Sequence, residues 1–145
     1  MLPLTSRFAL FMALCATLAT GCTNGPTTPA ATSGCRAVKT GTFVFRPQGR
    51  RSKWSYVITR TDSLQTEVEQ PGGGRSVLAV KWLNDCTYQV RLVSSTIPYP
   101  DSIQQLRKTS PLTMEILRTT DRYYVFHAQR APTDAAFVDT LWRQP

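Results

Sequence analysis

The chain has 145 residues, with 17 lysines and arginines against 9 aspartates and glutamates, and only one histidine. This length suits one domain preceded by a targeting segment. The 41% hydrophobic and 18% charged residues exclude a collagen-like, a coiled-coil and a globally disordered chain. One histidine and few carboxylates leave little material for a metal or acid–base site, so the composition argues against most enzyme classes and predicts no cofactor.

The first 21 residues predict an export signal. Arg7 is the only charged residue before Arg36, and an apolar run follows it over residues 8–19. In a helix this run spans about 18 Å, too short to cross a hydrocarbon core of about 30 Å. A positive charge, a short apolar stretch and small residues after it are typical of a secretory signal peptide, and a buried N-terminal helix is the alternative.

The segment ends in the letters LATGC at residues 18–22, which resemble the lipobox of bacterial lipoprotein precursors. Gly21 and Cys22 match that pattern, while Ala19 stands where the family usually has leucine. The resemblance implies that Cys22 carries a diacylglyceryl group that anchors the chain in a membrane. Ordinary cleavage that leaves Cys22 free is the alternative. Thr23 is not the aspartate associated with inner-membrane retention, so we expect a periplasm-facing lipoprotein of the outer membrane.

The remaining cysteines predict a disulfide. Cys15 would leave with the signal peptide and Cys22 would take the lipid, so Cys35 and Cys86 remain. In an oxidising periplasm two remaining cysteines are typical of a disulfide. A zinc site is the alternative, but no histidine or third cysteine lies near either residue in the sequence.

The mature chain divides into a lipidated tether over residues 22–34 and a single β domain over residues 35–145. Small and polar residues fill the tether without apolar periodicity. In the domain, apolar residues alternate with polar ones, as in half-buried strands. We expect strands at Gly41–Arg46, Lys53–Arg60, Ser63–Glu69, Ser76–Leu83, Cys86–Ser94, Leu112–Thr119, Arg122–Gln129 and Ala136–Arg143.

These strands predict an all-β, antiparallel, up-and-down meander of about eight strands, because short connections join antiparallel neighbours. In the one long connection, Asp101–Lys108 could form a helical turn capped by Asp101 or Ser102. No second layer of helices is predicted to cover the sheet. We therefore expect it to curl into a closed or half-open, lipocalin-like barrel, with a two-sheet β-sandwich as the alternative.

The register of two hairpins follows from the pairing that buries the apolar residues. A three-residue loop over residues 83–85 places Trp82 opposite Cys86 and buries Trp82 inside the sheet. The same reasoning sets Tyr56 opposite Val68 across another three-residue loop.

Parts of the domain resemble small exported lipoproteins common in Bacteroidota. These share a cysteine before a Gly-x-Phe strand, an Asp-Ser-x-Gln-x-Glu strand and a Trp-x-x-Asp-Cys-x-Tyr hairpin, matched here within residues 35–43, 62–67 and 82–88. The resemblance covers about residues 35–115 and is loose in the C-terminal third. It implies a fold and an address in the cell envelope but no reaction, and it strengthens the pairing of Cys35 with Cys86.

Candidate catalytic groups are few. His127 lies on a predicted strand with no serine or cysteine nucleophile in a recognisable motif, so we expect a structural or surface role. Glu67 and Glu69 share one face of a strand, with Asp62 nearby, and paired carboxylates can perform acid–base work when their environments separate their pKa values. Nothing in the sequence marks a cleft, so we expect a solvated strand face and a protein that is not an enzyme.

Two sets of residues are candidates for binding. Eight strands leave room for side chains or one small ligand, and five aromatic residues would line that space or fill the core: Trp54, Tyr56, Trp82, Tyr88 and Tyr124. A basic cluster around the first hairpin would contact anionic lipid or glycan surfaces, since export argues against nucleic acid. Its members are Arg46, Arg50, Arg51 and Lys53.

The sequence therefore predicts a non-catalytic envelope lipoprotein that binds an envelope protein, a glycan or a small ligand. A lipocalin-like carrier of a small apolar ligand is the alternative, and an envelope hydrolase is a weaker one. A cavity on the order of several hundred Å³ inside the barrel would favour the carrier.

Overall fold

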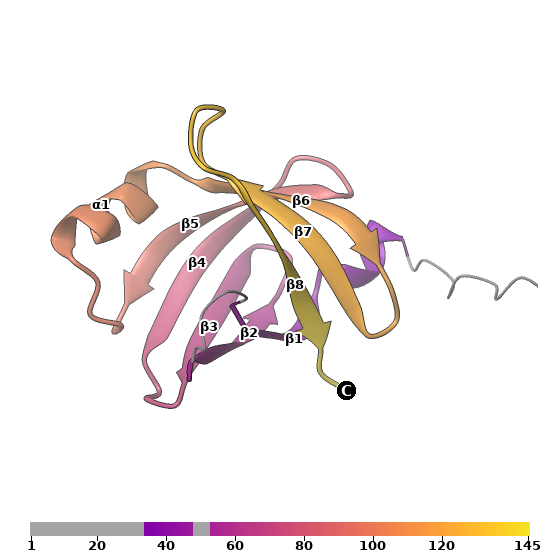
Figure 1. Cartoon of the computed structure of the whole chain (residues 1–145), viewed down its shortest axis with the longest axis horizontal. Coiled ribbons are helices and arrows are strands. Elements are labelled where there is room, and N and C mark those ends of the chain that lie inside the picture. Colours follow the sequence, from indigo (N-terminus) through magenta and orange to yellow (C-terminus); the bar gives the residue numbers. More distant parts are fainter. Residues whose placement is uncertain (1–33, 48–52) are drawn as a thin grey trace, which may run out of the picture.

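The computed structural model describes residues 34–47 and 53–145. The predicted signal peptide, the tether up to residue 33 and the lipidation site Cys22 lie outside the described residues. Eight strands follow one another, each antiparallel to the next, and the first also pairs with the last (Figure 1). The strands are β1 (Gly41–Phe45), β2 (Ser55–Arg60), β3 (Leu64–Gln70), β4 (Arg75–Trp82), β5 (Thr87–Ser95), β6 (Leu112–Thr119), β7 (Tyr123–Gln129) and β8 (Phe137–Arg143). The predicted meander is confirmed, and the barrel is closed rather than a sandwich.

In the part of the chain that the structure describes, two short helices accompany the strands: the 3₁₀ helix η1 (Cys35–Val38) and the α-helix α1 (Asp101–Thr109). The predicted helical turn is confirmed, but its predicted caps are wrong. The N-cap position is Pro100, and no side chain caps the helix. Asp101 lies in the first turn, where a negative charge interacts favourably with the helix dipole.

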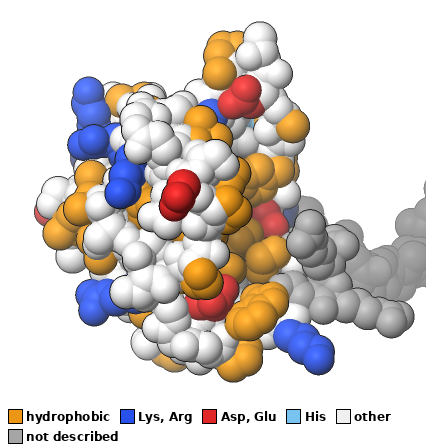
Figure 2. Space-filling view, turned by 90° about the vertical axis from the view of Figure 1, so that its left-hand side faces the viewer, with side chains coloured by type: hydrophobic (Ala, Val, Ile, Leu, Met, Phe, Trp, Pro, Cys, Tyr) orange, Lys and Arg blue, Asp and Glu red, His pale blue; other side chains and the backbone are white. Residues whose placement is uncertain are grey.

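The barrel has two different ends. One end, here called the closed end, is where β1 begins and where β4 and β5 meet. The fully buried Val38 of η1 packs against the core at this end. At the opposite, open end, β5 leads through α1 to β6. In Figure 1 the closed end lies to the right and α1 to the left. Figure 2 therefore looks onto the open end.

The hairpin between β4 and β5 differs slightly from its predicted register. Trp82 pairs with Tyr88, not with Cys86. The backbone of Leu83 bonds to that of Thr87, so the three-residue loop begins one residue later than expected. Asn84 favours this turn because its side-chain oxygen accepts a hydrogen bond from the Cys86 N–H at 2.8 Å. The predicted face is retained, but Trp82 is only half-buried.

The hairpin between β2 and β3 has a register that the sequence argument got wrong. Tyr56 pairs with Glu69 rather than with Val68. The loop has two residues instead of three, because Thr61 donates its backbone N–H to Leu64 at 2.8 Å. A shift of one residue turns every side chain of a strand to the other face. Polar residues of β3 consequently point into the barrel.

The hydrophobic core occupies the closed end and the middle of the barrel. Every strand except β3 contributes inward-facing side chains to it, and η1 adds Val38. The buried members are Val38, Phe43, Ile58, Leu78, Val80, Tyr88, Val90, Leu92, Met114, Ile116, Tyr124, Phe126, Ala128 and Leu141. Towards the open end this packing gives way to a cavity.

Candidate functional site: a cavity at the open end

A cavity of about 350 Å³ lies inside the open end of the barrel. Its apolar lining residues are Phe45, Pro47, Ile58, Val90, Leu112, Met114, Phe126, Phe137 and Leu141. Its polar lining residues are Tyr56, Gln65, Glu67, Tyr88, Tyr99 and Arg107. On this end, hydrophobic side chains gather in the right-hand half of Figure 2, and Lys and Arg side chains lie mainly towards its margins. An apolar hollow with a few polar groups is the usual form of a small-molecule site.

A line of polar side chains runs from the closed end to this cavity. The Arg60 Nε donates to Gln65 Oε1 at 2.7 Å, and Gln65 Nε2 donates to Glu67 Oε1 at 2.8 Å. Glu67 Oε2 then lies 3.7 Å from an Nη atom of Arg107, which is on α1. The observed register of β3, which differs from the predicted one by one residue, places both Gln65 and Glu67 in this line.

At the inner end of the line, Arg60 is 2% exposed and its guanidinium is well provided with acceptors. It donates to the Val38 carbonyl at 3.2 Å and to the hydroxyls of Tyr88 and Tyr124 at 2.8 and 2.7 Å. It also lies over the Tyr88 ring, 4.4 Å from the centroid. Burial raises the pKa of Tyr88 well above its ordinary value, despite the nearby Arg60 charge, so this phenol stays neutral. Arg60 is a fixed part of the core.

At the outer end, Glu67 and Arg107 are largely buried, with 18% and 17% of their side chains exposed. Burial raises the pKa of Glu67, and the opposing effects of Arg107, the hydrogen bond from Gln65, and Arg60 do not cancel it. The Arg107 guanidinium lies over the Tyr99 ring at 4.6 Å. Among the described residues it makes this contact and the long ion pair but no hydrogen bond.

The predicted aromatic set is divided between the two ends. Tyr56 and Tyr88 line the cavity. Tyr124 is buried in the closed-end core, and Trp82 packs partly buried against it, so neither lines the cavity. Trp54 is 47% exposed and also lies outside the lining.

The predicted solvated face of β3 is wrong. Glu67 is largely buried in the barrel, and Glu69 is half-buried, where its Oε1 accepts a hydrogen bond from the Tyr56 hydroxyl at 3.3 Å. Asp62 is exposed in the turn before β3. Gln65 and Glu67 were therefore missed as cavity residues because the predicted register buried Val68. Arg107 was missed because nothing in the sequence shows where α1 lies relative to the barrel.

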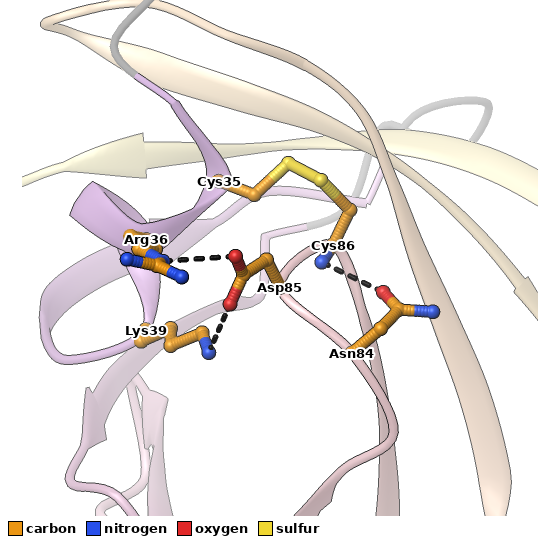
Figure 3. The surroundings of a disulfide bond; sticks show 6 residues. All are labelled: Cys35, Arg36, Lys39, Asn84, Asp85 and Cys86. Atoms are coloured by element: carbon orange, nitrogen blue, oxygen red, sulfur yellow. Dashed lines mark hydrogen bonds and ion pairs between the residues drawn. A yellow bond between two sulfur atoms is a disulfide. The ribbon is translucent and has the colours of Figure 1, made fainter.

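The predicted disulfide between Cys35 and Cys86 is present, with their Cα atoms 5.1 Å apart (Figure 3). Next to it, Arg36 and Lys39 donate to the two carboxylate oxygens of Asp85 at 2.8 and 2.9 Å. These hydrogen bonds, from Lys39 first and then Arg36, lower the pKa of Asp85. The covalent bond and the ion pairs together hold η1 across the closed end.

The remaining candidates among the described residues do not line the cavity. Arg46 and Lys53 are exposed, while Arg50 and Arg51 lie outside the described residues. His127 faces away from the core on β7, paired in register with Glu115.

No protein-family model, curated protein or solved structure matches the chain. Within residues 34–47 and 53–145, no group of three or more His, Cys, Asp or Glu side chains could hold a metal ion. The helices in those ranges are all too short or too polar to cross a membrane.

Proposed function

We propose that this protein is a non-catalytic module of the cell envelope that binds a small, largely apolar molecule in the open-end cavity. The observation that carries the proposal is the cavity of about 350 Å³, which lies inside an eight-stranded barrel and is lined mostly by apolar side chains. A core filled from end to end would instead have favoured a module that recognises an envelope protein or glycan through its outer surface.

The size and lining of the cavity describe its occupant. About 350 Å³ is near the lower limit for small-molecule sites, so a single aliphatic chain or a small ring system fits better than a two-chain lipid. Removing apolar surface from water contributes about 25 cal/mol per Å², and the aromatic and aliphatic walls supply that surface. Affinity for such an occupant would come mainly from its apolar part.

The test uses two substitutions on one strand. Val90 lines the cavity, whereas Val93 is 53% exposed on the outer face of β5. Titration with the neutral fluorescent probe N-phenyl-1-naphthylamine should show binding that Val90→Trp weakens at least about tenfold, because the indole fills the cavity. Val93→Trp should bind like the unsubstituted protein.

A second blocking variant guards against a folding defect in the first. Leu112 lines the cavity from β6 and is only half-buried, so Leu112→Trp tests the same space with less disturbance of the core. Circular dichroism would establish that each variant folds. Unchanged probe affinity in both folded variants, or no binding to the unsubstituted protein, would overturn the proposal.

We also propose that the domain is exported and anchored by a lipid on Cys22. The support is the short apolar run ending in Gly21-Cys22, together with the Cys35–Cys86 disulfide, a bond typical of oxidising compartments. Labelling expressing cells with a radioactive fatty acid should mark the protein, and Cys22→Ala should remove both label and membrane association. Cys15→Ala, inside the signal peptide, should retain both. Label that survives Cys22→Ala would contradict the anchor.

A further inference from the structure

We propose that the ligand carries one anionic head group, which the Arg107 guanidinium binds where α1 meets the cavity. The inference rests on the proposed function, because a head group has a place only if the cavity takes a ligand. Arg107 is the residue through which α1 lines the cavity.

The first step is the unused hydrogen-bonding capacity of Arg107. Only 17% of its side chain is exposed, and among the described residues no acceptor lies within hydrogen-bond distance. A guanidinium carries a planar set of N–H donors that matches a carboxylate or phosphate in a two-point contact. Among the described residues the fully buried side-chain polar atom without a partner is Trp82 Nε1, so the Arg107 nitrogens still reach solvent, and an anion in the cavity would replace that water with charge-assisted hydrogen bonds.

The second step is that Glu67 does not satisfy Arg107. The 3.7 Å separation exceeds a hydrogen bond, and the other carboxylate oxygen of Glu67 is engaged by Gln65 at 2.8 Å. Gln65 in turn is held by Arg60 at 2.7 Å. These hydrogen bonds connect the Oε1 atom of Glu67 to the closed end, while Oε2 lies 3.7 Å from Arg107.

The third step is the balance of charge. Arg130 and Arg107 line a smaller recess of about 50 Å³ together with Glu67. Arg130 donates to the Ser110 carbonyl, and its pKa is lowered by burial and by the charge of Arg107. With Arg60 behind Gln65, three guanidinium groups lie around Glu67, while the Asp134 carboxylate, which interacts with Arg130, does not line the cavity.

Two other carboxylates on the inward side of the strands do not line the cavity. Glu69 accepts the Tyr56 hydroxyl, and buried Asp139 accepts the Thr140 N–H at 2.7 Å. The excess of positive charge next to the cavity therefore favours an anion over an amine.

This arrangement gives the two cavity charges opposite roles. Arg107 attracts the head group, and Glu67 repels it. Arg107→Gln should therefore weaken binding of an anion, while Glu67→Gln should strengthen it. An amine would reverse both effects, so the pair of variants reports the sign of the ligand charge.

The experiment compares ligands with one tail and different heads: decanoic acid, decyl phosphate, decanol and decylamine, each displacing N-phenyl-1-naphthylamine at neutral pH and low salt. At least one acid should bind about tenfold more tightly than decanol, the effect of one charge-assisted contact. Comparing decanoic acid with decyl phosphate shows whether the site prefers a carboxylate or a phosphate head group. Arg107→Gln should abolish the preference, and Lys108→Gln, the exposed neighbouring cation on α1, should leave it intact.

The outcomes separate the two proposals. If decanol or decylamine displaces the probe as well as the acids do, or if Arg107→Gln leaves the order unchanged, the cavity binds ligands but the head-group inference is wrong. If the probe itself does not bind, the proposed function fails and this inference fails with it.

Discussion

Each end of the barrel contains a largely buried arginine, one with hydrogen-bond partners and one without any among the described residues. At the closed end Arg60 is buried with acceptors for Nε and both Nη atoms, while at the open end Arg107 is largely buried without a hydrogen bond in the described part of the chain. Both belong to one polar line through Gln65 and Glu67. The difference teaches that burial of a charge alone does not identify a binding site. The distinguishing feature is whether the protein provides the partners.

The largest expected effect is at the disulfide of the closed end. Replacing Cys35 and Cys86 with serine removes a cross-link between residues 51 positions apart, which the loop-entropy model values at about 4 kcal/mol. Urea unfolding should show that loss in the free energy of unfolding, and reduction of the unsubstituted protein should reproduce it. Probe affinity at the open end should stay the same wherever the variant is folded. Unchanged stability would show that the closed end does not depend on this bond.

Arg60→Met should have the next largest effect. The substitution leaves the buried Val38 carbonyl and Gln65 side-chain oxygen without their donor, at about 1–3 kcal/mol for each unsatisfied group. We expect a total loss of about 3 kcal/mol in urea unfolding. Arg91→Met, on the exposed face of β5, is the matched control and should change stability by less than about 0.5 kcal/mol. If Arg60→Met and Arg91→Met changed the free energy of unfolding equally, the buried hydrogen bonds of Arg60 would not stabilise the closed end.

Glu67→Gln should stabilise the protein at neutral pH. Since burial raises the pKa of Glu67 in the folded state, the protonated carboxyl is favoured on folding, and that contribution to stability is lost as pH rises through the raised pKa. The amide mimics the neutral form, so its advantage should be present at neutral pH and disappear below the ordinary pKa of about 4.3.

Thermal unfolding across this pH range would measure the effect. Glu115→Gln, on the exposed side of β6, is the control and should show no such advantage. A less stable Glu67→Gln at neutral pH would mean that the ion pair with Arg107 outweighs burial.

Arg107→Gln should have the smallest effect on stability. Its ion pair with Glu67 is long, at 3.7 Å, and it makes no hydrogen bond among the described residues, so we expect less than about 1 kcal/mol in urea unfolding. Comparing this loss in the free energy of unfolding with the loss from Arg60→Met is the most direct test of the difference between the two arginines. A loss at Arg107 as large as that at Arg60 would assign Arg107 to the framework instead of the ligand.

The sequence was sufficient for the barrel because its signals are local. Alternating apolar residues and short turns recovered all eight strands within a few residues, and the disulfide followed from counting cysteines. Such features depend on neighbours along the chain, and a single hairpin contains enough information to place them.

The cavity could not be predicted in the same way. The more apolar face of β3, with Leu64 and Val68, points outward, and the polar face, with Gln65 and Glu67, points inward, so a preference for burying apolar residues chose the wrong face. The true face is stable because Arg60 finds partners on η1, β5 and β7. Those partners are 22, 28 and 64 residues away, and only the closed barrel brings them together.

The disulfide also determines how the domain carries mechanical load. Tension on the chain ahead of Cys35 passes through the sulfur–sulfur bond into the turn between β4 and β5, which joins two strands in the wall of the barrel. The force therefore bypasses η1 and β1, whose attachment would otherwise have to bear it. When the domain is pulled from this point, the load acts on the closed end. The open end lies on the far side, and the strands of the barrel stay paired.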